Sequence, residues 1–330
     1  MRLSLRISLG WVLFGLCASL SSSVVALPSA EHVIAAHVRA LGGRAALDSV
    51  QSLIIRGRYS EGDFSIDAVQ AKMRPYYRLV GDPGKPVMGF AEGYDGSAWE
   101  YYEKPGIVLR TVGAAAAASR HGLPILGPLV DYKAQGFAIK VCGVEKVAGH
   151  RAYRLRVHMP DAYEEDQLIA TKTFLPVASR KVAEIHAFGE KVATETRFSN
   201  FHKVAGVLFP FLAQEVEIAT GKVLNTFKTA SIEVNSKLDP AAFSPPEIKR
   251  TPLQALLERL FAERTDRQAV LWSYRDFRRA NTEVDTAFAI EAIGYQILKM
   301  GEAETAIALL EGNARAYPKS SDAQFGLGRA

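Results

Sequence analysis

The side chains that could carry out chemistry are few and widely spaced in this chain. His32 and His37 are five positions apart, whereas two zinc-binding histidines on one helix stand at i and i+4. The motifs of serine nucleophiles, Gly-x-Ser-x-Gly and Ser-x-x-Lys, do not occur. The other histidines are scattered and expected on exposed strands or turns: His121, His150, His158, His186 and His202. We therefore expect no catalytic residue, no metal site and no cofactor, and a hydrolase built from distant residues stays open as an alternative.

Three further segments have residue types found in reactive or ligand-binding sites. Gly81–Pro86 resembles a phosphate loop, but no Ser or Thr follows Lys85 and Pro86 lacks an amide donor, so a hairpin turn is expected. The acidic run Glu164–Asp166 lacks the alternate oxygen ligands and glycine bend of a calcium loop, so a solvated loop tip is expected. Cys142 ends an alternating run, which favours a buried packing role over a reactive one.

The amino terminus has the pattern of a secretory signal peptide. Arg2 and Arg6 precede an apolar run from Leu9 to Leu20, and small residues lead to a cleavage site near Ala26. The apolar run is shorter than the roughly 20 residues of a membrane span, which favours a cleaved signal over a membrane anchor. We expect residues 1–26 to be removed and the chain to be exported, most simply to the periplasm.

Removal of the signal would change both the charge and the cysteine count. The whole chain carries +5, and loss of the two signal arginines leaves +3. Since this charge forms no concentrated basic patch, nucleic acid is not expected as a partner. Cys17 leaves with the signal unless it is lipid-modified, for which Leu16 is a poor preceding residue, and Cys142 alone cannot form an internal disulfide. No later stretch is long and apolar enough to anchor the mature chain in a membrane.

The periodicity of the chain predicts the elements that carry these side chains. Residues 30–41 have apolar positions on one helical face and are followed by Gly42-Gly43, and a short helical turn is expected over residues 44–48. From residue 52 to about 234 the period is two, with turn signals between short runs. Many short strands without intervening helices predict an antiparallel meander with one apolar face.

One segment inside the strand region does not fit a strand. Residues 113–129 contain five consecutive alanines, Ala114–Ala118, and two prolines. Such a segment could cover the concave face of a curled sheet, because alanines allow close approach. A surface insertion without a binding role is the alternative.

Short segments between residues 41 and 246 form a series with a fixed order. They are Leu41–Leu47 with Val50–Leu53, Tyr94–Trp99, Phe174–Val177, Arg197–Phe201, Val204–Pro210, and the closing Val234-Asn235, Phe243 and Pro245-Pro246. In order and spacing the set resembles bacterial exported proteins related to the periplasmic lipoprotein carriers of the Lol type, over about residues 30–247. The resemblance implies an unclosed antiparallel half-barrel whose apolar concave face is plugged by helices. In the carriers that cavity holds acyl chains.

The resemblance has a limit that bears on function. A carrier needs a mobile lid and a cavity-lining arginine that controls release, and no arginine of this chain matches by motif, so lipoprotein shuttling is in doubt. Binding of an acyl chain or another apolar ligand remains as the expectation. The candidate ligand contacts lie on alternating apolar faces, with a role in the core as the alternative: Trp99, Leu155, Val157, Val216 and Ile218.

The period becomes helical again in the last third of the chain. One helix is expected from Pro252 to Phe261 and a second over residues 266–280. Residues 285–318 have the spacing of a tetratricopeptide-type repeat, and its 34-residue period carries Gly294 to Gly328, inside an incomplete second unit. The residues that would pack the repeat are Ile290, Ile293, Gly294, Ala306, Leu310 and Pro318.

The fold class expected is therefore α+β. Residues 27–250 would form a curved antiparallel half-barrel covered by helices, and residues 251–330 an all-α helical-repeat region. The helices before residue 285 could serve as a degenerate repeat, the apolar face could dock on the sheet, or the chain could be truncated. The function expected is non-enzymatic binding of a lipid or acyl chain, and the alternative is a scaffold that binds a protein through the helical repeat.

Overall fold

The computed structural model describes residues 27–83, 89–121, 124–184, 191–248 and 250–329. The expected signal peptide, the second half of the Gly81–Pro86 turn and His186 lie outside the described residues. No helix in the described ranges is long and apolar enough to cross a membrane.

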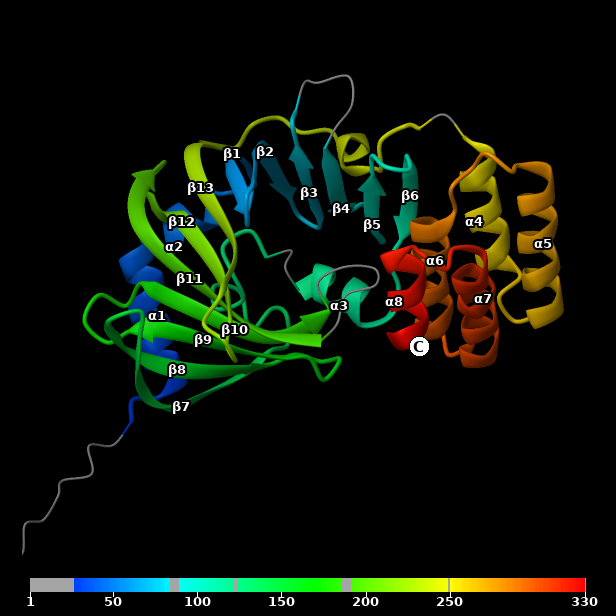
Figure 1. Cartoon of the computed structure of the whole chain (residues 1–330). Coiled ribbons are helices and arrows are strands. Elements are labelled where there is room, and N and C mark those ends of the chain that lie inside the picture. Colours follow the sequence, from blue (N-terminus) through cyan, green and yellow to red (C-terminus); the bar gives the residue numbers. More distant parts are fainter. Residues whose placement is uncertain (1–26, 84–88, 122–123, 185–190, 249, 330) are drawn as a thin grey trace, which may run out of the picture.

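Within the described ranges, thirteen strands form one antiparallel sheet in the order β6-β5-β4-β3-β2-β1-β13-β12-β11-β10-β9-β8-β7. The strands are β1 (Ser52–Glu61), β2 (Phe64–Met73), β3 (Tyr76–Gly81), β4 (Phe90–Tyr94), β5 (Ala98–Tyr102), β6 (Ile107–Arg110), β7 (Ala138–Val147), β8 (His150–His158), β9 (Glu164–Ala170), β10 (Pro176–Glu184), β11 (Lys191–Val204), β12 (Val207–Glu217) and β13 (Val223–Val234). Two meanders meet in the middle, where β1 pairs with β13, and β6 and β7 are the two edges. The sheet is therefore unclosed, and the α+β fold with a curved antiparallel sheet is confirmed (Figure 1).

The sheet curls because several strands carry bulges and small residues. The register of β1 against β13 shifts between Arg56 and Gly57. A Cβ placed on Gly57 would lie 2.3 Å from the Lys228 carbonyl oxygen, so only glycine allows this close approach. Further shifts occur in β12 before Val216 and in β7 before Gly143.

Two helices at the amino-terminal end pack on the concave side of the sheet. They are α1 (Ala30–Leu41) and α2 (Arg44–Asp48), as expected from the sequence. Val33 and Ile34 of α1 pack against Leu155 and Val157 of β8. His37 is buried on the same helix, and its Nδ1 lies 2.8 Å from the Phe174 carbonyl oxygen. Burial lowers the pKa of His37, so this histidine is a neutral structural residue near pH 7.

The segment expected to cover the concave face does so in two pieces. Its first piece is the helix α3 (Gly113–His121), in which Ala115 is buried. Its second piece continues as a loop whose Ile125, Leu129 and Val130 join the core beneath α1 and α2. The alanine-rich stretch is therefore part of the covered side of the sheet and not a surface insertion.

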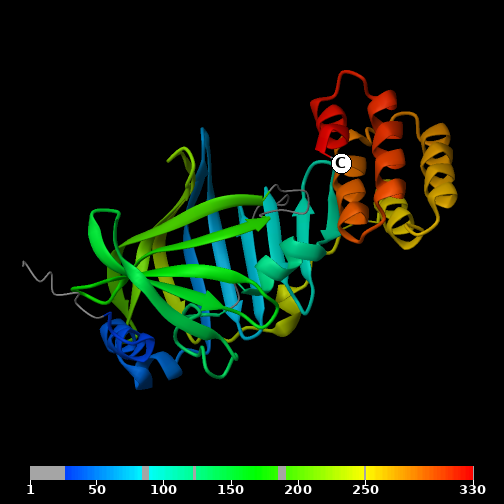
Figure 2. The same cartoon turned by 90° about the horizontal axis from the view of Figure 1, so that it is seen from below.

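The carboxy-terminal region consists of a 3-10 turn and five helices. They are η1 (Pro240–Phe243), α4 (Pro252–Ala262), α5 (Arg267–Ala280), α6 (Ala287–Lys299), α7 (Ala303–Ala316) and α8 (Ser321–Arg329). The side chains of Thr251 and Asp266 cap α4 and α5, at the boundaries that the sequence predicts. Figure 2 shows the helices α4 to α8 beyond the edge strand β6, at the opposite end of the molecule from α1.

The helical region shares its core with the sheet. Ile107 and Leu109 of β6 belong to the same buried cluster as Leu257, Ile290 and Ile293. The Gln254 side chain accepts from the Val108 N–H at 3.0 Å and donates to the Val108 carbonyl at 3.1 Å. Of the three alternatives left open for this region, docking of its apolar face on the sheet is the one that the structure shows.

The residues of the expected repeat lie between α6 and α7. A Cβ on Gly294 would lie 2.7 Å from Leu310 Cδ2, so glycine permits the close crossing of these helices. Ile290, Ile293 and Ala306 are buried at the same interface, and Pro318 follows α7. Gly328 has no neighbour within 4 Å of an added Cβ. Assignment to the tetratricopeptide type stays a prediction.

Asn313 departs from the alanine usual in such repeats, and the structure gives a physical reason for it. The Asn313 side chain is fully buried, accepts from the Tyr274 hydroxyl at 3.0 Å and donates to the Ala287 carbonyl at 2.8 Å. A buried amide with both ends hydrogen-bonded fixes the relative position of three helices.

Candidate functional site

The strand register decides which side chains share a face of the sheet. Side chains of directly paired residues point to the same side, so the face of Leu155 can be followed through Gln167, Ser179 and Thr196 to the middle of the sheet. This is the inner, concave face, because α1 packs on it at Leu155. The opposite face is called the outer face here.

Trp99 lies on the outer face and not with Leu155. Its register partners are Gly93 and Arg110, and its ring packs with Ala91 and Tyr101 beneath the segment after η1. The indole N–H donates to the Phe243 carbonyl at 2.9 Å, and the side chain is 1 % exposed. Trp99 therefore holds the chain that leads from the sheet into the helical region.

The other four residues that the sequence suggested as ligand contacts do not lie together on one exposed surface either. Leu155 and Val157 are on the inner face but fully buried under α1. Val216 pairs with Glu195 on the outer side and is buried, whereas Ile218 follows β12 and is 47 % exposed. The structure therefore does not bring these five residues together on one face, because alternation along single strands does not tell which face becomes concave.

The middle of the inner face carries an apolar group of buried and partly buried side chains, which we call the inner aromatic cluster. Tyr59 and Phe90 pack edge to face with ring centroids 5.6 Å apart. The cluster consists of Ile55, Tyr59, Ala68, Tyr77, Leu79, Phe90 and Phe227. Its members come from β1, β2, β3, β4 and β13, so it spans the centre of the curl.

Titratable side chains border the inner aromatic cluster on the same face. Lys72 lies over the Tyr77 ring, 5.5 Å from its centroid, and the Tyr77 hydroxyl donates to Glu92 at 3.2 Å. Glu100 accepts from the Tyr102 hydroxyl. Burial raises the pKa of Tyr77 and of Tyr102 well above the usual value, and both phenols are therefore hydrogen-bond donors at any pH near neutrality.

A second polar group faces inward from β9 and β10. Gln167 donates to Glu165 at 2.8 Å, and Lys181 is the register partner of Glu165. Burial raises the pKa of Glu165, against the opposing effects of the Gln167 hydrogen bond and the Lys181 charge. The acidic run Glu164–Asp166, expected as a loop tip, instead begins β9, and this expectation is wrong.

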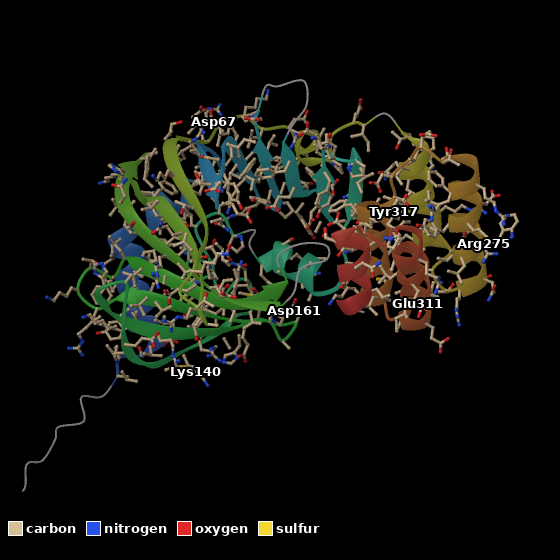
Figure 3. The ribbon with its side chains drawn as sticks, in the orientation of Figure 1. Asp67, Lys140, Asp161, Arg275, Glu311 and Tyr317 are labelled. Atoms are coloured by element: carbon tan, nitrogen blue, oxygen red, sulfur yellow. The ribbon has the colours of Figure 1, made fainter. Side chains whose placement is uncertain are left out.

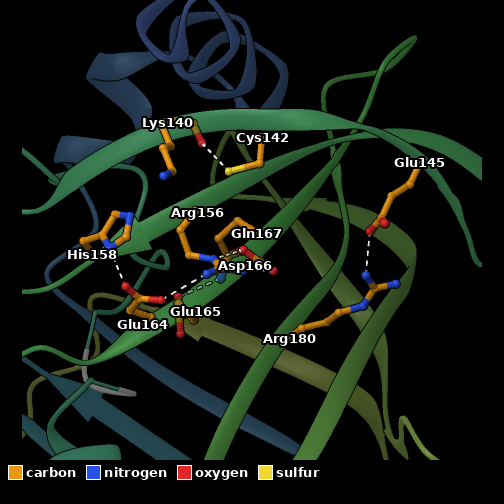
Figure 4. A network of polar contacts seen from close by, with 10 residues as sticks. All are labelled: Lys140, Cys142, Glu145, Arg156, His158, Glu164, Glu165, Asp166, Gln167 and Arg180. Atoms are coloured by element: carbon orange, nitrogen blue, oxygen red, sulfur yellow. Dashed lines mark hydrogen bonds and ion pairs between the residues drawn. The ribbon is translucent and has the colours of Figure 1, made fainter.

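The two neighbours of Glu165 point outward and form ion pairs there. Arg156 donates to Asp166 at 3.0 Å and to Glu164 at 3.0 Å, and His158 lies 2.6 Å from Glu164 (Figure 4). A further pair joins Arg180 to Glu145 at 2.6 Å. These ion pairs connect neighbouring strands on the outer face. Cys142 is half-buried on the edge strand β7. Within the described ranges, no group of three or more His, Cys, Asp or Glu side chains could hold a metal ion.

The helix α3 is anchored at both ends as it crosses the concave side. It contacts β10 on one wall and β4 and β5 on the other (Figure 1). Before α3, the Val112 N–H donates to Gln296 of the helical region at 2.9 Å. At its end, His121 Nε2 lies 2.8 Å from an Asp161 carboxylate oxygen, and Figure 3 marks Asp161 below this helix. The contacts of α3, with the hydrogen bond just before it, therefore connect the helical region to the inner face of the sheet.

Two pockets lie away from the inner face. One, of about 450 Å³, lies between β6, Pro245–Ile248 and α4, and its lining is mostly apolar. Its two arginines are each paired, Arg110 with Asp95 at 2.6 Å and Arg250 with Glu258 at 2.7 Å. The other is an open groove of about 460 Å³ between α1 and Val130–Lys133. Both pockets are lined by residues that hold elements together.

Lys72 is a cation on this face whose pKa is lowered. Burial, and next the positive charge of Lys181, lower the pKa of Lys72 to about 8. A folded-state pKa below the unfolded value of 10.5 means that the charged ammonium destabilises the fold. Perturbed pKa values cluster at functional sites, so the face with Lys72 and the partly buried aromatics is the candidate site.

We expect Lys72→Met to raise the free energy of unfolding at pH 7 by roughly 1–3 kcal/mol. Below pH 8 both states carry the proton and the full cost of the charge is present. Between about pH 8 and 10.5 the unfolded state binds more protons, so the wild type gains stability with rising pH and the advantage of the variant shrinks. Urea unfolding at pH 7 and pH 10 measures the difference, and an equal gain at both pH values would contradict it.

Comparison with known proteins gives distant structural matches. No protein-family model and no curated protein matches this sequence. Among solved structures, a DUF1329 family protein from Desulfovibrio piger is 16 % identical, with a TM-score of 0.45 over 65 % of this chain and 96 % of its own. A LolA superfamily protein from Nitrosomonas europaea is 12 % identical, with a TM-score of 0.42 over 66 % of this chain and 99 % of its own. The half-barrel assignment accordingly depends on the strand order of this chain itself.

Proposed function

We propose that this protein is an exported, non-enzymatic binding protein that holds an amphiphilic ligand, an acyl chain with a polar head, on the inner face of the half-barrel. One observation carries the proposal: the inner aromatic cluster, whose aromatic rings Tyr59, Tyr77 and Phe90 are only partly buried, lies next to titratable groups on the same concave face. The aromatics would cover the acyl chain, and each Å² of apolar surface removed from water would contribute about 25 cal/mol. The polar border would stay in contact with the head.

The test is native mass spectrometry of the mature protein, purified from a periplasmic extract without detergent. We expect an added mass in the lipid range. Phe90→Ala should weaken binding of an acyl ligand by about tenfold, since it removes one ring from the cluster. Phe64→Ala is the matched control, because Phe64 is exposed at the start of β2 and should leave binding unchanged.

A bare mass together with no binding of added acyl ligand would contradict the proposal. It would favour the alternative function, a protein scaffold that acts through the helical region. The most exposed large apolar side chain of that region is Trp272 on α5. Residues around Trp272 would then be the first to examine for partner binding.

A further inference from the structure

The helix α5 carries an exposed row of polar, aromatic and basic side chains, which we call the α5 stripe. The buried side of the helix is formed by Val270, Ser273 and Tyr274. The stripe lies on the opposite side, where its members follow one another at steps of three or four residues. They are Gln268, Trp272, Arg275 and Arg279, all of them exposed. Figure 3 marks Arg275 on the side of α5 that faces away from the other helices.

The arginines of α5 account for the net positive charge of the protein. The helix contains four arginines and one acidic residue, Asp276, which gives it a charge of +3. The whole chain carries +5, or +3 without the two signal arginines, so the rest of the mature chain is neutral on balance. Arg278 lies over the Tyr317 ring, 4.9 Å from its centroid, whereas Arg275 and Arg279 are exposed.

The stability of the helix explains only part of the stripe. Cations in the last turn interact favourably with the helix dipole, which accounts for Arg278 and Arg279. Arg275 and Trp272 lie before that turn. Of the large apolar side chains that the structure describes, Trp272 is the most exposed, at 63 %. Apolar ring surface in water has a free-energy cost that contact with an apolar phase removes.

The shape and chemistry of the stripe favour a lipid surface over a protein as its partner. Tryptophan is enriched at membrane–water interfaces, because its ring is apolar and its N–H is polar. Arginine is attracted to anionic head groups and pairs with phosphate in a bidentate geometry. A stable protein interface covers about 800 Å² on each partner. The stripe belongs to one convex helix, and neither pocket described above includes a residue of α5. A bilayer needs no matching shape, because its head groups are mobile.

We propose that the α5 stripe docks the protein on the surface of a bilayer that contains anionic phospholipids. The Trp272 indole enters the head-group layer, and Arg275 and Arg279 pair with lipid phosphates. This inference goes beyond the proposed function and does not depend on it. Figure 1 shows α5 at the end of the molecule, and no residue of α5 belongs to the inner aromatic cluster.

The experiment is co-sedimentation of the mature full chain with vesicles of phosphatidylcholine, with and without phosphatidylglycerol. We expect binding to the anionic vesicles to be at least tenfold tighter, and to be lost in about 1 M salt. Trp272→Ala, and the double variant Arg275→Gln with Arg279→Gln, should each weaken this binding by about tenfold. In the wild type, tryptophan emission should shift to the blue on binding, and Trp272→Phe should abolish the shift, since Trp99 is already buried.

The matched control removes two positive charges at the other end of the molecule. Lys140 on β7 and Arg151 on β8 are exposed, and Figure 3 marks Lys140 far from α5. The double variant Lys140→Gln with Arg151→Gln has the same net charge as the double variant of the stripe. It should bind the anionic vesicles within about twofold of the wild type. Thermal unfolding of each variant shows whether a loss of binding comes from misfolding.

The outcomes separate this inference from the proposed function. Equal binding to both kinds of vesicle, or an equal loss in the control and stripe variants, would overturn the docking proposal. No vesicle binding would also overturn it, and binding of a polyglutamate peptide would then assign the stripe to an acidic protein. Vesicle binding that is lost in Phe90→Ala and kept in Trp272→Ala would place the lipid contact on the inner face instead. Titration with dodecyl phosphate tests the inner face separately, and the stripe variants should bind it like the wild type.

Discussion

Removal of residues 251–330 is expected to leave a chain that self-associates and unfolds at a much lower temperature than the full-length protein. Ile107 and Leu109 of β6 are buried against α4 and α6 and would become exposed. Exposure of two such side chains costs roughly 3–6 kcal/mol. That is a large share of the 5–15 kcal/mol by which domains are typically stable, so the truncated half-barrel should be marginal.

The truncation would also open the edge of the sheet. In the full chain, Gln254 occupies both the N–H and the carbonyl of Val108, much as a neighbouring strand would. An apolar edge strand with free backbone groups is a template for pairing with another chain. We therefore expect dimers or larger species, measured by size-exclusion chromatography with light scattering, alongside thermal unfolding followed by circular dichroism.

A point variant separates the edge effect from the loss of the whole region. Gln254→Leu keeps the helix but leaves the Val108 amide and carbonyl without partners, which should cost about 1–3 kcal/mol. Gln268→Leu on the exposed start of α5 is the matched control and should change stability by less than about 0.5 kcal/mol. A truncated chain that stays monomeric and melts like the full-length protein would show that the helices form an independent module.

Periodicity within one element was enough to predict most helices and the extent of the sheet. The helix over residues 30–41, the strand region from Ser52 to Val234 and the helix starting at Pro252 are confirmed. Each of these depends on a local pattern, because a buried face repeats at the period of its own element. Capping residues such as Thr251 then fix the boundaries.

The site could not be predicted in the same way, because it depends on which residues share a face across strands. Glu164, Glu165 and Asp166 look alike in sequence, yet the pleat turns Glu165 inward and its two neighbours outward to Arg156. Lys72 and Lys181 are more than a hundred residues apart, and only the strand register shows that both lie on the inner face. The alternation of Ala68, Gln70 and Lys72 along β2 predicts that these three side chains share one face of the strand. It does not show whether that face is the concave one.

The docking of the helical region on β6 was one of three open alternatives for a similar reason. The apolar stripe of α4 predicts that another element covers it, but the stripe does not identify that element. The decisive contacts are made by Gln254 and Gln296, which look like ordinary surface residues of helices in the sequence. Hydrogen bonds between segments that are far apart in the chain produce no periodic pattern in the sequence.

Trp99→Ala is expected to lower the free energy of unfolding by about 3–5 kcal/mol without weakening ligand binding by the molecules that stay folded. The indole is almost fully buried on the outer face and its N–H satisfies the Phe243 carbonyl, so the variant leaves both a cavity and an unpaired carbonyl. Trp99→Phe should cost less, because most of the cavity is filled. Urea unfolding measures the stability, and titration with dodecyl phosphate below the unfolding transition measures binding.

Trp272→Ala is the control for this experiment, because Trp272 is 63 % exposed on α5 and its loss should change stability by less than about 0.5 kcal/mol. The comparison decides between two roles for the one tryptophan that the sequence suggested as a ligand contact. A Trp99→Ala protein with unchanged stability and lost binding would place the ligand on the outer face, beneath η1. A destabilised protein with intact binding would instead agree with a ligand held on the inner face, where the aromatic cluster and Lys72 lie.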